Sequence, residues 1–177
     1  GMTRAYVKIQ EGCDQFCAYC AIPYARGPLR SRSEQDTIDE INMLVERGYK
    51  EVILTGIHIG AYGRGVKDET CDLTGLCRRI LDETAIERLR IGSLEGIEVT
   101  DALIEMIASD ERMAKHLHLP LQSGCDRTLS AMRRPYDTEQ FREMMRRIRG
   151  KVPNIAITTD LIVGFPQETE EEFGETL

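Results

Sequence analysis

The chain has 177 residues and a formal net charge of −7, with 41% hydrophobic and 30% charged residues. This balance is typical of a soluble globular protein, and the length allows one domain with a full core but not two ordinary ones. No apolar run is long enough to span a bilayer and no signal-peptide pattern opens the chain, so we expect a cytoplasmic protein with no membrane partner. The acidic charge argues against nucleic-acid binding by charge alone, because phosphate recognition normally needs a basic surface.

The chain opens with a strand predicted over residues 4–9, and three cysteines follow it. Cys13, Cys17 and Cys20 have the spacing C-x3-C-x2-C, so their thiolates can converge on one metal centre only if the chain loops around it. Three cysteines fill three corners of a [4Fe–4S] cluster and leave one iron open, which suggests catalysis rather than electron transfer alone. A zinc site and three unrelated core cysteines are the alternatives, but zinc normally takes four ligands and nothing adjacent supplies the fourth.

After a loop predicted over residues 21–33, helices and strands alternate. Ser33 with Asp36 resembles a capping box, which opens a helix that ends at Gly48. Later helices are predicted over 73–81, 100–107, 126–132 and 138–149 and after Thr169, and later strands over 52–54, 89–91, 116–119 and 155–163. Five strand–helix units predict an α/β fold with a parallel sheet and right-handed crossovers. A barrel or opened barrel is favoured over a flat doubly wound sheet.

The cysteine motif, with Tyr19 before its last cysteine, resembles the signature of the radical S-adenosylmethionine (SAM) enzymes. The strings 8–13 and 22–27 resemble one branch of them, the methylthiotransferases. The resemblance implies a truncated, partial parallel β/α barrel and a [4Fe–4S] cluster on Cys13, Cys17 and Cys20. It also implies that SAM binds the open iron and is cleaved by an electron from an external donor.

In such a sheet, ligands bind at the carboxyl ends of the strands. Gly56 and His58 follow the second strand, where glycines allow close backbone approach; the resemblance relates this segment to the one that meets the SAM amino group, and a flexible turn is the alternative. Ser93 and Glu95 follow the third strand. The resemblance favours a ribose or methionine contact for one of them, and a helix-capping turn is the alternative.

The last two strands supply the remaining candidates. Gln122 follows the fourth strand as a second ribose contact. Arg134, in a segment beyond it, is a candidate partner for the SAM carboxylate, although most arginine pairs lie on solvated surface. Ile162 and Val163 follow the fifth strand and resemble the adenine-binding motif of the family.

Residues 8–12 and 55–58 look most like the enzymes that add a methylthio group to C2 of N6-threonylcarbamoyladenosine at tRNA position 37. The resemblance therefore implies tRNA as the partner of the full-length enzyme. Isopentenyladenosine tRNA and ribosomal-protein methylthiotransferases are alternatives within the branch. A non-catalytic iron–sulfur redox module is the alternative from another class.

The resemblance also carries an expectation about domains. Residues 1–177 would be a radical SAM core with five of six strand–helix units, without the N-terminal cluster domain, the sixth barrel strand and the C-terminal RNA-binding domain. We therefore expect the chain alone to transfer no methylthio group. We also expect it to self-associate through the open edge of its fifth strand.

Overall fold

A computed structural model describes residues 3–64 and 71–177. Its strands are β1 (Arg4–Glu11), β2 (Arg30–Ser31), β3 (Glu51–Gly56), β4 (Arg88–Ile91), β5 (His116–His118) and β6 (Ala156–Thr158). Its α-helices are α1 (Ile22–Arg26), α2 (Glu34–Glu46), α3 (Leu73–Glu83), α4 (Asp101–Ser109), α5 (Asp126–Ala131), α6 (Thr138–Lys151) and α7 (Glu170–Thr176). Two short 3-10 turns, η1 (Ile59–Ala61) and η2 (Gly96–Glu98), follow β3 and β4. None of the helices in this part of the chain has the length and apolarity needed to cross a membrane.

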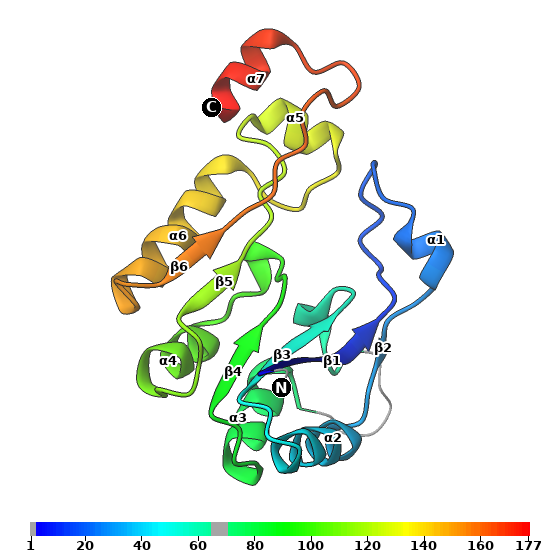
Figure 1. The fold of residues 1–177 in the computed structure, drawn as a ribbon. Coiled ribbons are helices and arrows are strands. Elements are labelled where there is room, and N and C mark those ends of the chain that lie inside the picture. The colour runs from blue at the N-terminus through cyan, green and yellow to red at the C-terminus, as the bar shows by residue number, and fades with distance from the viewer. Residues whose placement is uncertain (1–2, 65–70) are drawn as a thin grey trace.

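The strands form an open, curved wall. One sheet has the order β2-β1-β3-β4, with β1, β3 and β4 parallel, and β5 and β6 form a second parallel pair. Isolated parallel bridges, Leu89 to Met113 and Ser93 to His118, join β4 to the chain around β5. Figure 1 shows α2, α3, α4 and α6 along the outside of this wall. The predicted α/β architecture is therefore confirmed, as a half-barrel that does not close.

The core lies between the strands and these outer helices. In β3 the buried run Val52, Ile53 and Leu54 has at most 7% exposure, because a parallel strand covered on its outer side needs apolar residues. Leu76 and Ile80 of α3 are fully buried against this layer. The predicted caps are present: the Ser33 side chain accepts a hydrogen bond from the backbone of Asp36. Such caps fix where each helix begins and thus where each strand-end loop points.

Two predicted elements were wrong. Residues 21–33 are not all loop, because they hold α1 and β2. Pro23 stands in the first turn of α1, where its missing N–H is not needed, so it is compatible with this short helix. Strand β2 then returns antiparallel to the end of β1, pairing Gln10 with Ser31.

The fifth strand was predicted over residues 155–163 but is paired as β6 only from Ala156 to Thr158. Beyond it, the Thr159 hydroxyl donates to the Leu119 carbonyl and accepts from the Leu121 N–H. The Thr159 side chain thus takes the place of backbone pairing at this point. The segments that follow β5 and β6 pair again at a bridge between Gln122 and Leu161.

Candidate functional site

The cysteine loop leaves the carboxyl end of β1 through a turn that only glycine fits. Gly12 has φ +79°, and a Cβ there would lie 1.9 Å from the Pro28 carbonyl oxygen. The Cys13 N–H donates to the Gly27 carbonyl at 3.1 Å, which ties the loop to the end of α1. The turn after β1 therefore packs against the 27–28 backbone, which fixes where the thiols start.

The three predicted ligands occupy one loop but do not crowd around one point. Within the described residues, a single set of metal-ligand atoms lies within 4.8 Å of one another, and it is Cys13, Asp14 and His58. Thiolates on one zinc ion, each at about 2.3 Å, would lie within about 4 Å of one another. The wider spread of Cys13, Cys17 and Cys20 suits a cluster, in which each thiolate meets its own iron. The three cysteines thus fit a [4Fe–4S] cluster.

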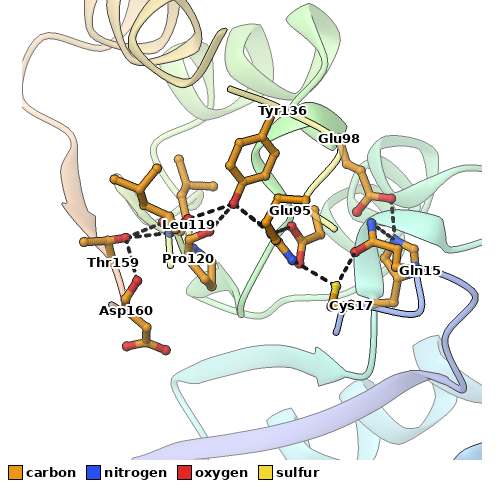
Figure 2. A network of polar contacts seen from close by, with 12 residues as sticks. Gln15, Cys17, Glu95, Glu98, Leu119, Pro120, Tyr136, Thr159 and Asp160 are labelled. Carbon is orange, nitrogen blue, oxygen red and sulfur yellow. Dashed lines mark hydrogen bonds and ion pairs between the residues drawn. The ribbon is translucent and has the colours of Figure 1, made fainter. Parts of the chain in front are cut away.

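Arg134 ties the cysteine loop to the barrel wall. Figure 2 shows the polar network to which its partners Cys17, Glu95 and Tyr136 belong. Arg134 Nη1 donates to Cys17 Sγ at 3.3 Å and to the Tyr19 hydroxyl at 3.1 Å. Its Nη2 pairs with the Glu95 carboxylate, and its side chain is only 1% exposed. The Tyr136 hydroxyl accepts from Arg134 Nε at 3.0 Å and can donate to the Pro120 carbonyl at 2.9 Å. The fully buried guanidinium is thus satisfied by protein atoms.

The electrostatics of this network favour a fixed positive charge beside Cys17. Burial acts to lower the pKa of Arg134, but the Glu95 carboxylate and the Tyr136 hydroxyl outweigh it and raise the pKa well above its usual value. Burial also raises the pKa of Tyr19, so its hydroxyl stays protonated. Burial raises the pKa of the Cys13 thiol as well, so that thiol becomes a thiolate readily only when a metal binds it.

His58 and Glu98 form a second buried pair on the other side of the loop. His58 Nδ1 lies 3.7 Å from Cys13 Sγ, and Nε2 lies 2.7 Å from Glu98 Oε1. Both side chains are 3% exposed. Gln15 Nε2 lies 3.2 Å from the same His58 nitrogen. The cysteine loop is therefore held from two sides, by Arg134 and by His58.

The other predicted SAM residues lie at strand ends but apart from this network. Gly56 has φ +149°, and a Cβ there would lie 2.3 Å from the Gln10 carbonyl oxygen. The close approach of β1 therefore explains the glycine at this position without a bound ligand. Ser93 lies at the bridge to His118, and Gln122 donates its N–H to the Asp160 carbonyl. Ile162 donates its N–H to the Gln122 carbonyl, which brings two of the predicted contacts together, and Val163 is 64% exposed. Their roles in SAM binding stay predictions.

Sequence reasoning did not find Tyr136, Glu98 or Gln15. Tyr136 follows Pro135 in a segment with no periodic pattern, so its burial, at 6% exposure, has no signal in the sequence. Glu98 ends η2, three residues after Glu95, and the two carboxylates have different partners: Glu98 contacts His58 and Glu95 contacts Arg134. Gln15 lies between Cys13 and Cys17, at a position that the cysteine spacing leaves open to any residue type.

An open parallel half-barrel with a three-cysteine loop at the carboxyl end of its first strand defines the class of radical SAM cores. A family model described as the radical SAM superfamily matches residues 7–177, and the chain belongs to this superfamily. Enzymes of this superfamily use a [4Fe–4S] cluster and SAM, so the predicted cofactors are confirmed.

Curated relatives include two kinds of tRNA-modifying enzyme. The chain is 46% identical over 176 residues to "Threonylcarbamoyladenosine tRNA methylthiotransferase MtaB" of Bacillus subtilis (strain 168). It is 41% identical over 174 residues to "tRNA-2-methylthio-N(6)-dimethylallyladenosine synthase" of Clostridium perfringens (strain SM101 / Type A). Each match covers 98% of this chain, but only 38% and 39% of the respective relative. The predicted likeness to radical SAM methylthiotransferases is confirmed.

Solved structures share the fold at low identity. The cobalamin-dependent radical SAM enzyme OxsB, with aqua-cobalamin bound, gives a TM-score of 0.74 at 14% identity, over 97% of this chain and 25% of that one. The radical SAM methyltransferase TsrM from Kitasatospora setae, with cobalamin and a [4Fe–4S] cluster bound, gives 0.72 at 17% identity, over 94% of this chain and 32% of that one. These likenesses confirm the partial-barrel fold.

Proposed function

We propose that the chain is the SAM-cleaving core of a tRNA methylthiotransferase that adds a methylthio group to C2 of N6-threonylcarbamoyladenosine at position 37. The observation that carries the proposal is the loop of Cys13, Cys17 and Cys20, clamped at the carboxyl ends of the strands by Arg134. The 46% identical relative supports the choice of substrate. A cytoplasmic location and an external electron donor follow from such a reaction.

Cys13, Cys17 and Cys20 would hold the cluster. When bound and reduced, the cluster supplies the electron that cleaves SAM and generates a 5′-deoxyadenosyl radical. The protein's own residues would position the bound SAM and exclude water from it. Arg134 keeps a charged hydrogen-bond donor on the Cys17 sulfur, and its three other partners, Glu95, Tyr19 and Tyr136, hold it there.

The strand-end residues would orient SAM across the mouth of the half-barrel. Glu95 and Ser93 offer polar groups for ribose or methionine, and Gln122 lies at the next strand end. Arg134 is committed to Glu95, so a SAM carboxylate reaching it would share the guanidinium with that side chain. Ile162 and Val163 offer an apolar face for adenine.

The substrate is tested by a chimera, because the chain spans only 38% of the relative named MtaB. This chain replaces the matched 176 residues of that relative in cells that lack the native enzyme. Mass spectrometry of digested tRNA is expected to show methylthiolated threonylcarbamoyladenosine. Methylthiolation of dimethylallyladenosine instead would favour the second candidate, which the 41% identical relative supports. A chimera with Cys17→Ala is the inactive control.

A further inference from the structure

Phe16 and Tyr24 form an exposed aromatic pair beside the cysteines. Their ring centroids lie 5.5 Å apart and their planes meet at 75°, which is an edge-to-face contact. Phe16 is 46% exposed and Tyr24 is 79% exposed, and neither belongs to the hydrophobic core. Phe16 directly precedes Cys17, and Tyr24 stands on α1, which lies alongside the cysteine loop in Figure 1. Two large apolar rings therefore face solvent next to the proposed cluster site.

The backbone around the two rings is held by hydrogen bonds. The Ala18 N–H donates to the Met132 carbonyl at 2.9 Å, and the Gly27 N–H donates to the Pro23 carbonyl at 3.0 Å at the end of α1. Phe16 has a φ of 47°, in the left-handed region, which is uncommon for a residue other than glycine and clusters at functional sites. Because the Phe16 ring is half exposed, burial of the ring does not compensate for this strained backbone.

Basic side chains stand on the elements that flank the pair. Lys8 Nζ lies 2.8 Å from a Glu11 carboxylate oxygen, and Arg26 Nη1 lies 3.3 Å from the other. The Lys8 hydrogen bond lowers the pKa of the Glu11 carboxyl, and the charge of Arg30 acts in the same direction. Arg30 donates to the carbonyls of Arg26 and Pro28 and forms no ion pair with any described residue. Three cations thus surround one carboxylate, in a chain whose formal net charge is −7.

We propose that Phe16 and Tyr24 form a stacking platform for an unpaired nucleotide next to the target adenosine, with Arg26 and Arg30 contacting its phosphates. The inference rests on the proposed function, in which the substrate is tRNA. Proteins that bind unpaired RNA combine aromatic rings, on which bases stack, with basic side chains that contact the backbone. The local excess of positive charge favours a polyanion over an apolar protein surface as the partner. A nucleotide stacked beside Cys17 would bring its neighbour close to the SAM site.

The platform is tested by the binding of a fluorescently labelled stem-loop RNA that carries position 37 to the anaerobically reconstituted chain. Tyr24→Ala is expected to weaken binding about fivefold or more, the lower end of what one stacked base contributes. Tyr24→Phe keeps the ring and is expected to bind like wild type. Tyr6→Ala is the matched control, because Tyr6 on β1 is 67% exposed and lies outside the pair.

Arg30→Gln tests the phosphate contact. We expect it to reduce the slope of log affinity against log salt concentration by about 0.7, the value for one phosphate of a single strand. Unchanged RNA binding by Tyr24→Ala would overturn the proposal, as would equal losses in Tyr24→Ala and Tyr24→Phe or in Tyr24→Ala and Tyr6→Ala. A wild-type chain that does not bind the RNA would also overturn it.

A crosslink locates the nucleotide without any variant. The stem-loop RNA carries 4-thiouridine next to the target adenosine, ultraviolet light couples it to adjacent side chains, and mass spectrometry identifies the tryptic peptide. Coupling to the peptide of residues 9–26, which holds both rings, supports the proposal, and coupling confined to other peptides refutes it.

Sedimentation of Tyr24→Ala tests a second copy of the chain as the occupant. Loss of self-association with unchanged RNA binding would assign the aromatic pair to a contact between copies and overturn the proposal. The tRNA product of the chimera reports the proposed function separately. An active chimera whose chain fails the crosslinking test would therefore remove only the platform.

Discussion

Arg134 Nη1 lies 3.3 Å from Cys17 Sγ, although the two residues are 117 positions apart in the chain. The contact closes the cysteine loop onto the segment that links α5 to α6. A backbone hydrogen bond from Ala18 N–H to the Met132 carbonyl, at 2.9 Å, reinforces the same junction. The first and the fourth strand–helix units are thus joined through the cysteine loop.

Arg134→Gln is expected to destabilise the protein strongly. The change leaves the Glu95 carboxylate, 19% exposed, without its cation. Breaking a buried pair by removing one partner costs about 3–5 kcal/mol, which urea unfolding measures. Arg133→Gln is the matched control, since Arg133 is exposed on the same turn. Adding Glu95→Gln to Arg134→Gln is expected to recover part of the loss, and equal stabilities of the two single arginine variants would disprove the clamp.

Cys17→Ala is expected to abolish cluster assembly. Anaerobically reconstituted wild type is expected to carry roughly four iron and four sulfide per chain. Cys125→Ala is the control, because Cys125 is buried outside the cysteine loop as the residue before α5. Iron and sulfide analysis gives the answer, and an equal loss in both variants would rule out the ligand assignment.

Gly12→Ala is expected to disrupt the entry to the cysteine loop. The positive φ alone costs about 1–2 kcal/mol for a side-chain-bearing residue, and the approach of a Cβ to the Pro28 carbonyl adds to it. Gly150→Ala in α6 is the contrasting variant: a Cβ there meets no atom within 4 Å, so helix propensity predicts a gain of about 0.5–1 kcal/mol. Thermal unfolding compares the two. Similar melting temperatures would show that the turn has no special geometry.

SAM binding is expected to depend on the cluster. Two polar groups of SAM, its amino group and its carboxylate, are expected to bind the open iron, so calorimetry should show a sharp loss of affinity after the cluster is removed. Circular dichroism of the stripped protein checks that the barrel stays folded. Undiminished binding to the cluster-free protein would argue against anchoring through iron.

The sequence made most of the strands and the cysteine motif recognisable, because both depend on local patterns. The apolar run of β3 and the spacing of Cys13, Cys17 and Cys20 need no knowledge of distant contacts. The pairing of β2 with β1 could not be predicted, because β2 has only two residues. Its position depends on the turn at Gly12, which packs against the returning 27–28 backbone.

The side chains that contact the cysteine loop were harder to predict than the loop itself. Arg134 was named as a candidate for SAM, but its pairing with Glu95 depends on how α5 packs beside the loop. Glu98 meets His58 across 40 positions of chain, through two short turns that carry no sequence signature. Contacts of this kind arise from tertiary packing, which periodicity does not encode.

Formation of 5′-deoxyadenosine shows whether the cysteine loop supports reductive cleavage of SAM. Reconstituted protein is reduced with dithionite under anaerobic conditions and incubated with SAM, and the products are separated by liquid chromatography with mass detection. We expect slow formation of 5′-deoxyadenosine and methionine by the wild type and none by Cys17→Ala. A wild-type protein with a full, reduced cluster that forms no 5′-deoxyadenosine would contradict the account and favour a redox module.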